Sequence, residues 1–408
     1  MNKYHIAITD TDLYKLSMQL AICRLYPRAI VRYSFINRGG REFPDGFAKR
    51  LREIINEFRG ITLTENEKNF LREKCYYMDP VYLDFLSGYR YDPTEVFINQ
   101  KGSELIITIE GLWHRTVLWE VPLMATISEL YFEMTGKVLD VGASRKINEE
   151  KFSELACLRI PTSDFGTRRR FSFENHKIVL EDFQKYAEGG TAGSFVFMGS
   201  SNVYLSMINN TVPIGTHAHE WFMYHAARFG FKLANQMALD AWSEVYQGDL
   251  GIALTDTFTT DVFFKAFTTK YAKLFDGVRQ DSGDPVEFAR KAVQHYKNLR
   301  INPASKVIVF SDGIDSFDTI QRIKQACTDD EGRLKIQPRL GIGTWLTNDV
   351  RAPFGLGLIK PLNMVIKMTA CLIDGDWIST VKLSDNKTKH TGDKKMINLC
   401  QQLLKIKK

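Results

Sequence analysis

The sequence predicts an α/β protein with two parts, an N-terminal α/β domain and an irregular, incomplete α/β barrel. Its 408 residues exceed the size of one ordinary hydrophobic core. From about residue 155, short apolar runs alternate with helical patterns, as in parallel sheets, and about seven such units favour a barrel. An open sheet remains the alternative. We expect residues 1–150 to form the first domain and 151–360 the barrel.

Apolar periodicity predicts the elements of the N-terminal part. Strict alternation through Leu105, Ile107 and Ile109 indicates a strand over 104–110, and a second strand is expected over 30–36. Helices are expected over 12–26, 42–58, 65–73 and 122–134.

The second part carries the alternating pattern. Strands are expected at 158–160, 194–198, 212–214, 251–254, 277–279, 307–310 and 340–342. A helix is expected over 285–299, with Asp284 as N-cap, Pro285 at the first position and Glu287 at the third. The basic, amphipathic residues 394–408 predict a surface helix.

Composition narrows the functional class. Hydrophobic residues make up 44% and charged residues 25% of the chain, as in ordinary globular proteins. The net charge of +6 comes without a nucleic-acid-binding signature. Six scattered cysteines without a CxxC pair argue against a disulfide scaffold and favour a reduced, cytoplasmic setting. We find neither a secretory signal nor an apolar run of the ~18–20 residues that span a membrane.

Polar residues gather where the predicted strands end, which is where such a barrel carries its reactive groups. These segments are 162–170, 255–257, 279–284, 311–313 and 341–344. Carboxylates, glycine-rich backbone and arginines together suit a phosphorylated sugar and Mg²⁺. Each element alone also has a plain structural interpretation. Asp284 is expected to be a helix cap, and Arg169 and Arg170 to lie on a solvated face. Asp256, Asp281 and Asp312 could equally be solvated loop carboxylates.

Other well-known motifs are absent from the sequence. GIGTWL lacks the third glycine of the dinucleotide fingerprint, and GxxxxGK[ST] does not occur. The spacing from Glu220 to His225 does not match the zinc motif HExxH.

Seven motifs in order resemble those of nicotinate phosphoribosyltransferases. They are TDLYK near the start, DFGTRRRFSFENH at 164–176, GSSNVYL at 199–205, GTHAHEWFM at 215–223, LTDTFTTDVFF at 254–264, FDGVRQDSGDP at 275–285 and FSDGID at 310–315. The match runs from about residue 9 to about residue 370. Such a series in register is far more specific than any single motif.

The resemblance implies a type II phosphoribosyltransferase fold, in which residues 361–408 complete the N-terminal domain. It also implies a homodimer with shared active sites. Members of this family condense nicotinate with PRPP to nicotinate mononucleotide and pyrophosphate, a step of NAD biosynthesis and salvage. ATP hydrolysis accompanies the reaction through a phosphohistidine, and Mg²⁺ is the cofactor. Nucleic acid and membrane are not expected partners, and the expected location is the cytoplasm.

The resemblance also implies roles in nicotinate binding. Phe165 is expected to stack on the pyridine ring, and Tyr14 of the partner subunit to cover the other face. Arg279 is expected to meet the nicotinate carboxylate, and Arg168 to lie near the ring or the phosphate. A neutral Ser201, where nicotinamide-using relatives carry Asp, favours the acid over the amide.

The resemblance also implies which residues bind PRPP. Asp281 and Asp312 are expected to address the ribose and Mg²⁺–pyrophosphate. The 5′-phosphate is expected to be cradled by Gly341, Gly343 and Thr344.

The expected phosphorylated residue is His219. Asp256 is expected to hydrogen-bond its imidazole and fix the tautomer. His217, where close relatives carry a polar non-basic residue, adds a second candidate imidazole. The rival interpretations are a nicotinamide- or quinolinate-using relative and a catalytically inactive PRPP-binding regulatory homologue.

Overall fold

The computed structural model describes residues 3–188, 197–328, 334–349 and 360–406. The chain forms two compact units. Unit 1 comprises Met1–Ile22, Arg32–Gly215 and Ile342–Lys367, and unit 2 comprises Cys23–Val31, Thr216–Gly341 and Met368–Lys408. These limits differ from the expected boundaries at 150 and 360, because residues 151–215 group with the N-terminal segment.

Unit 1 contains a small sheet in the order β1-β3-β2. Its strands are β1 (Ile30–Asn37), β2 (Val96–Lys101) and β3 (Glu104–Leu112), which agree with the strands expected over 30–36 and 104–110. β2 and β3 form an antiparallel hairpin whose register runs from Val96 opposite Ile109 to Lys101 opposite Glu104. Gly102 allows the tight turn because its φ is +57°, a conformation that side chains disfavour.

Helices make up most of the rest of unit 1. They are α1 (Leu13–Leu25), α2 (Phe47–Asn56), α3 (Glu65–Lys74), α4 (Pro80–Gly88), α5 (Trp113–Thr116), α6 (Glu120–Met134), α7 (Val141–Leu158), α8 (Phe173–Glu188), α9 (Val203–Ile208) and α16 (Thr344–Thr347). Short 3₁₀ turns are η1 (Glu57–Gly60), η2 (Pro93–Glu95), η3 (Val117–Trp119) and η4 (Thr167–Arg169). The four helices expected from periodicity are confirmed, although α2 begins later than expected.

Two of the expected strands in unit 1 are wrong. Leu158 is the last residue of α7, and Arg159 ends the helix in a left-handed conformation, so residues 158–160 form no strand. The strand begins later, as β4 (Thr162–Asp164), and pairs in parallel with β5 (Phe197–Ser200). Residues 212–214 form only an isolated bridge from Pro213 to Ser200. Part of the strand expected at 194–198 lies outside the described residues.

Unit 2 is built on four parallel strands in the order β9-β8-β7-β6. They are β6 (Ile252–Leu254), β7 (Gly277–Gln280), β8 (Val307–Phe310) and β9 (Gln337–Ile342), as the apolar runs predict. Gly277 lets β7 approach β8, because a Cβ there would lie 2.1 Å from the Val307 carbonyl oxygen. Within the described part of this unit the four strands form an open row. A hairpin of β10 (Met364–Ile373) and β11 (Asp376–Ser379) follows.

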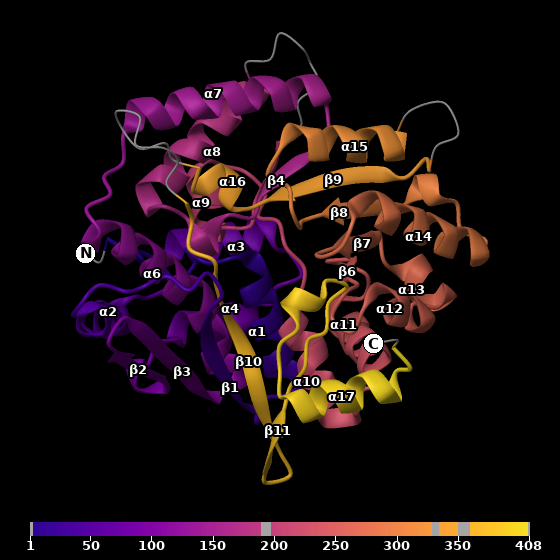
Figure 1. Cartoon of the computed structure of the whole chain (residues 1–408), viewed down its shortest axis with the longest axis horizontal. Coiled ribbons are helices and arrows are strands. Elements are labelled where there is room, and N and C mark those ends of the chain that lie inside the picture. Colours follow the sequence, from indigo (N-terminus) through magenta and orange to yellow (C-terminus); the bar gives the residue numbers. More distant parts are fainter. Residues whose placement is uncertain (1–2, 189–196, 329–333, 350–359, 407–408) are drawn as a thin grey trace. The chain divides into compact units, whose positions relative to one another are not determined.

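Helices accompany these strands. They are α10 (His219–Phe229), α11 (Ala234–Tyr246), α12 (Thr260–Ala266), α13 (Thr269–Leu274), α14 (Pro285–Asn298), α15 (Phe317–Thr328) and α17 (Lys394–Leu403), with 3₁₀ turns η5 (Pro303–Ser305) and η7 (Lys387–Lys389). The helix α14 packs against β7 and α15 (Figure 1). Asp284 caps it, since its Oδ1 accepts the Val286 and Glu287 amides at 2.9 Å. This confirms the expected cap.

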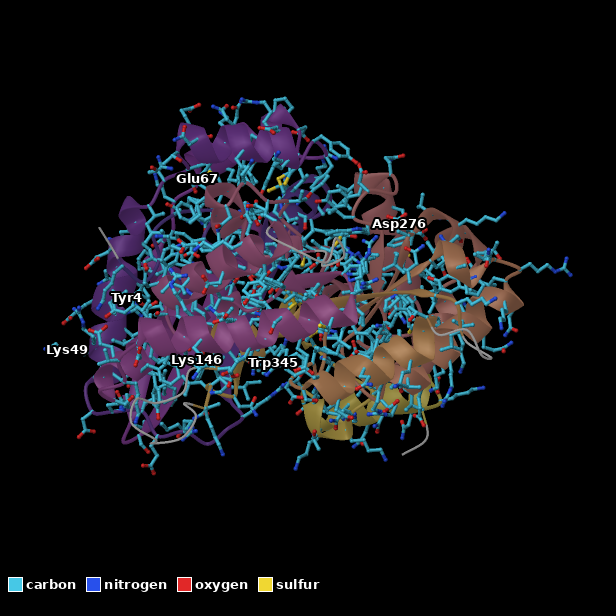
Figure 2. The ribbon with its side chains drawn as sticks, turned by 90° about the horizontal axis from the view of Figure 1, so that it is seen from above. Tyr4, Lys49, Glu67, Lys146, Asp276 and Trp345 are labelled. Atoms are coloured by element: carbon cyan, nitrogen blue, oxygen red, sulfur yellow. The ribbon has the colours of Figure 1, made fainter. Side chains whose placement is uncertain are left out.

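A buried ion pair organises the N-terminal segment of unit 1. The guanidinium of Arg170 donates to both carboxylate oxygens of Asp10, at 2.8 and 2.9 Å, and to the Tyr4 carbonyl oxygen at 3.2 Å. Arg170 is fully buried, so the solvated face expected for it is wrong. Glu67, labelled with Tyr4 in Figure 2, accepts the Thr9 amide at 3.1 Å and holds the same segment. Sequence alone offers no sign of this pairing.

No helix among the described residues is long and apolar enough to cross a membrane.

We predict that Arg170→Met destabilises the fold by about 3–5 kcal/mol, because it leaves the Asp10 carboxylate buried without its counter-ion. Chemical denaturation at pH 7 measures the effect. The control is Lys185→Met, which removes an exposed ammonium from α8 and is expected to stay within about 0.5 kcal/mol of the wild type. A loss below about 1 kcal/mol for Arg170→Met would show that the pair does not hold the fold.

Candidate active site

In unit 2, the start of one helix and the carboxyl ends of two strands bring an imidazole and two carboxylates together. His219 begins α10, Asp256 follows β6 and Asp281 follows β7. The His219 Nε2 atom lies 2.9 Å from Asp281 Oδ2, and its Nδ1 atom lies 3.0 Å from the Thr257 hydroxyl. Because parallel strands end at one edge of their sheet, residues distant in sequence meet there. All three were expected site residues.

The partner of the imidazole differs from the expected one. Asp256 Oδ1 is 3.7 Å from His219 Nε2, which is beyond hydrogen-bond range, so Asp281 makes the bond instead. The reason is that the other oxygen of Asp256 is held elsewhere: Oδ2 accepts the hydroxyls of Ser282 at 2.6 Å and Ser384 at 3.1 Å. Oδ1 accepts no hydrogen bond from any described residue and faces the imidazole.

Electrostatics keep the imidazole neutral and its partner ionised. Burial and the nearby charge of Lys382 lower the pKa of His219 to about 4, although Asp256 and Asp281 oppose the shift. Burial raises the pKa of Asp281, but Arg279 and the bond to His219 outweigh burial, so that pKa lies well below its ordinary value. An ionised carboxylate only accepts, so Nε2 carries the hydrogen and the Nδ1 lone pair accepts a hydrogen bond from the Thr257 hydroxyl.

Cations surround the carboxylates. Arg279 donates to Asp281 Oδ1 at 3.0 Å and to the Ser311 hydroxyl at 2.8 Å. Lys389 pairs with Asp312. Burial nevertheless leaves the pKa of Asp312 raised, even though Lys389 lowers it. The expected residues Arg279, Asp281 and Asp312 therefore lie in one charged network.

Sequence analysis missed several members of this network. Lys382 is buried, with its Nζ 3.8 Å from Asp256 Oδ2, and Lys389 binds Asp312. Both lie in the segment VKLSDNKTKHTGD at 381–393, which also supplies Ser384. Its alternation of lysines with hydroxyl and acidic residues was the available signal. Nothing in the sequence links that segment to Asp256, which lies far earlier in the chain.

A second set of expected residues meets within unit 1. The Ser201 hydroxyl donates to Asp12 Oδ1 at 2.8 Å, and the Arg168 Nε lies 3.8 Å from Asp12 Oδ2. Arg168 also lies 3.5 Å from Glu120, which pairs with the buried Lys15 at 2.5 Å. Asp12 was not predicted as a site residue, although it stands within the motif TDLYK. The charge of the Arg168 guanidinium is therefore offset by the carboxylates of Asp12 and Glu120.

Hydrogen bonds fix the loop that carries the expected aromatic residue. Asp164 is buried and accepts from His176 Nε2 at 2.7 Å and from the Ser200 hydroxyl at 2.5 Å. Asp164 also accepts the Gly166 amide at 2.9 Å. A Cβ on Gly166 would lie 2.4 Å from the Thr347 hydroxyl, so glycine is required there. The loop is thus held rigidly on both sides of Phe165.

The remaining expected residues lie close to these elements. Phe165 is half-buried, and its amide donates to the Ile342 carbonyl at 2.8 Å. A Cβ on Gly343 would come within 3.6 Å of the Phe165 carbonyl oxygen. Thr344 begins α16. Tyr14 is buried in the first turn of α1. Gly341 belongs to β9 in unit 2.

His217 has a different environment from His219. It is fully buried, with its ring edge-on to Phe222 at 5.2 Å and Trp242 at 4.9 Å between centroids. Neither ring nitrogen has a hydrogen-bond partner among the described residues. Burial, with the charges of Arg279 and His219, lowers the pKa of His217 to about 3. We therefore interpret it as a neutral packing residue.

The fold and the charges together define a class of protein. A parallel α/β unit that presents a neutral imidazole, ionised carboxylates and several cations at one edge of its sheet has the features of an enzyme for anionic, phosphorylated substrates.

Comparisons identify the family. The profile of the nicotinate phosphoribosyltransferase (NAPRTase) family matches residues 160–408, and that of its N-terminal domain matches residues 9–128. The chain is 47% identical over 402 residues to a nicotinate phosphoribosyltransferase of Chromohalobacter salexigens, covering 98% of each chain. The chain belongs to the nicotinate phosphoribosyltransferase family, a family of enzymes of NAD biosynthesis, and the resemblance seen in the sequence is confirmed.

Solved structures agree with this assignment. A nicotinate phosphoribosyltransferase from Porphyromonas gingivalis superposes with a TM-score of 0.91 at 40% identity, covering 98% of this chain and all of the other. One from Vibrio cholerae gives 0.89 at 30% identity, covering 98% and 94%. The expected fold class, α/β with a parallel sheet and an N-terminal domain, is therefore correct.

We predict that His217→Phe flattens the pH dependence of stability. In the unfolded chain this histidine gains a proton as pH falls through about 6.5, whereas the folded state resists protonation until about pH 3. Stability is therefore lost as pH falls, by about 2 kcal/mol between pH 7.5 and 5 for this residue. Urea denaturation of wild type and variant at both pH values measures the difference. Equal slopes with pH would contradict the neutral assignment.

Proposed function

We propose that the enzyme joins nicotinate to PRPP, forming nicotinate mononucleotide and pyrophosphate, and that ATP drives the reaction by phosphorylating His219. The single observation that carries the ATP step is the neutral imidazole held between Asp281 and Thr257. The names of its relatives support the two substrates.

The phosphorylation step follows from the tautomer. The Nδ1 lone pair of His219 attacks the γ-phosphorus of ATP, and the bond from that phosphorus to the bridging oxygen breaks, so ADP leaves with the electron pair. The product imidazole carries phosphate on Nδ1 and hydrogen on Nε2. The hydrogen stays on Nε2 and donates a hydrogen bond to Asp281, and the carboxylates of Asp281 and Asp256 offset the positive charge on the ring. Because the pKa is about 4, Nδ1 is unprotonated at neutral pH, and its lone pair becomes available when the Thr257 hydroxyl rotates away.

The sugar step needs positioning more than proton transfer. The pyridine nitrogen already has a free lone pair, so it attacks C1′ of PRPP without a general base as pyrophosphate leaves. We assign Lys382 and Lys389 to the leaving pyrophosphate, because both are ammonium groups bound to carboxylates of the site. Gly341, Gly343 and Thr344 are proposed for the 5′-phosphate.

Asp281 and Asp312 fit the proposed role toward Mg²⁺. Both offer carboxylate oxygens, the donors that this hard cation prefers. Their carboxylates are already engaged by Arg279, His219 and Lys389, which favours contact through pyrophosphate or water. When bound, Mg²⁺ offsets the negative charge of the pyrophosphate.

Nicotinate recognition is proposed for five residues. Phe165 and Tyr14 of the partner subunit would sandwich the ring, with Arg279 on the carboxylate. Arg168 would lie near the ring, next to the neutral hydroxyl of Ser201. This arrangement requires a homodimer with shared sites. The bond from Ser201 to Asp12 supports the acid over the amide, because it orients the hydroxyl and engages the neighbouring carboxylate.

We predict that His219→Asn loses phosphorylation, since the amide keeps polarity but offers no nucleophilic nitrogen. Wild type incubated with γ-labelled ATP should carry an acid-labile, alkali-stable label, and the variant should not. Stimulation by ATP should vanish, whereas some nicotinate mononucleotide should still form at saturating PRPP, because the imidazole is not a base in that step.

The matched control is His217→Phe, which should keep the label. A label that persists in His219→Asn and disappears in His217→Phe would show that His217, and not His219, is phosphorylated. A wild type without any label under turnover conditions would overturn the phosphohistidine step.

A further inference from the structure

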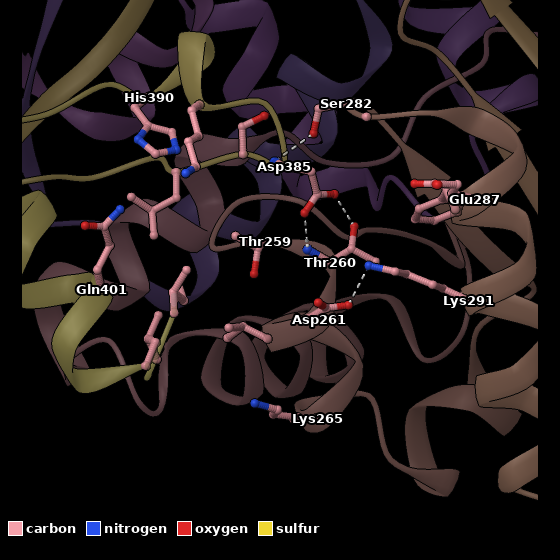
Figure 3. A pocket seen from close by; sticks show the side chains of 18 of the residues that line it. Thr259, Thr260, Asp261, Lys265, Ser282, Glu287, Lys291, Asp385, His390 and Gln401 are labelled. Carbon is pink, nitrogen blue, oxygen red and sulfur yellow. Dashed lines mark hydrogen bonds and ion pairs between the residues drawn. The ribbon is translucent and has the colours of Figure 1, made fainter. Parts of the chain in front are cut away.

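Unit 2 contains a cavity of 660 Å³ outside the site described above (Figure 3). It is formed by the start of α12, the loop between β7 and α14, the segment 383–390 and the end of α17 with residues 404–406. This volume is typical of pockets for small molecules of nucleotide size. None of the substrates assigned from the family's motifs is expected to bind in this cavity.

The charges in the cavity favour an anion. Two of its charged groups neutralise each other, since Lys291 binds Asp261 at 2.9 Å (Figure 3). Among the described residues, three other ammonium groups of the wall have no ion-pair partner; they belong to Lys265, Lys387 and Lys405. Against them stand two carboxylates without an ion-pair partner among the described residues, those of Glu287 and Asp385.

Two carboxylates of the wall are held by hydrogen bonds, and one of the two also has a cation partner. Asp385 accepts the Thr260 amide at 2.9 Å and its hydroxyl at 2.5 Å (Figure 3). Asp284 caps α14 and binds Arg322 at 2.8 Å. Three ammonium groups and two carboxylates of the wall are therefore without an ion-pair partner among the described residues, and the excess of one positive charge favours an anionic ligand.

The same cavity has an apolar side. Phe288 and Leu383 are buried in its wall, and Val262, Leu404 and Ile406 are half-buried there. A small inorganic anion would leave this surface uncovered. A ligand with a planar or apolar ring next to its phosphates would cover both kinds of surface, which is the chemistry of a nucleotide.

The wall is linked to the proposed phosphorylation site. Ser282 lines the cavity and donates to Asp256, and it accepts the Asp385 amide at 3.1 Å. Ser384 also lines the cavity and donates to Asp256. Thr259 and Ser384 have φ values of +77° and +69°, rare for residues with side chains. Such strain is stored where the surrounding structure or a ligand requires it.

We propose that this cavity binds a nucleoside diphosphate as an effector. Its phosphates meet Lys265, Lys387 and Lys405, and its base covers the apolar wall. Binding shifts Ser282 and Ser384 and thereby changes how Asp256 faces His219. The effect on phosphorylation rests on the proposed function, whereas the binding itself does not.

Calorimetric titration of the full chain with GDP tests the binding. GDP has a purine and two phosphates but no γ-phosphate to transfer. Saturating nicotinate mononucleotide fills the catalytic site during the titration. The expected result is one GDP bound per chain, with affinity at least tenfold weaker in the double variant Lys265→Glu, Lys405→Glu. The control Lys297→Glu, an exposed lysine of α14 outside the cavity, should bind as the wild type does.

Three results would overturn the proposal. The first is GDP binding that disappears when nicotinate mononucleotide is present, because the catalytic site would then be the binding site. The second is equal affinity in the double variant, with its unfolding transition unchanged. The third is guanosine binding as tightly as GDP, which would remove the role of the lysines.

The coupling is tested by the rate of His219 labelling at saturating ATP. GDP should change this rate in the wild type and leave it unchanged in the double variant. An unchanged rate in the wild type, with GDP bound, would contradict the coupling and leave the binding site intact. A wild type that takes up no label would refute the proposed phosphorylation, whereas the titration would still decide the cavity.

Discussion

The phosphorylation that we propose for this enzyme depends on the hydrogen bond between His219 and Asp281. Arg279 keeps Asp281 ionised, and an ionised carboxylate can only accept, so the bond determines which nitrogen carries the hydrogen. Burial makes the neutral imidazole the stable form. If Asp281 were protonated or displaced, the tautomer would no longer be specified and the lone pair would lose its direction.

The two carboxylates next to the imidazole have different roles. Asp281 orients the imidazole, while Asp256 keeps one oxygen bound by Ser282 and Ser384 and the other free toward the ring. The second carboxylate therefore contributes charge more than a hydrogen bond, at 3.7 Å. Lys382 limits that charge, which explains how two acidic groups lie beside one neutral histidine.

Local features of the chain were predictable from sequence, and long-range pairings were not. The cap of α14 and the strands β6 to β9 follow from spacing that depends on adjacent residues. The resemblance named His219, Asp256 and Asp281 as site residues, but it paired the imidazole with Asp256 and gave Asp281 to the ribose and Mg²⁺–pyrophosphate. They could not show that Asp281 makes the bond, that Arg170 is buried on Asp10, or that Lys382 joins Asp256, because those contacts depend on tertiary packing.

The most direct test is ¹⁵N NMR of the histidine-labelled enzyme, with the His219 signals assigned by their loss in His219→Asn. The account predicts a neutral ring with hydrogen on Nε2 from pH 5.5 to 8, since the pKa is about 4. An imidazolium that titrates near pH 6.5, or a neutral ring with hydrogen on Nδ1, would contradict it.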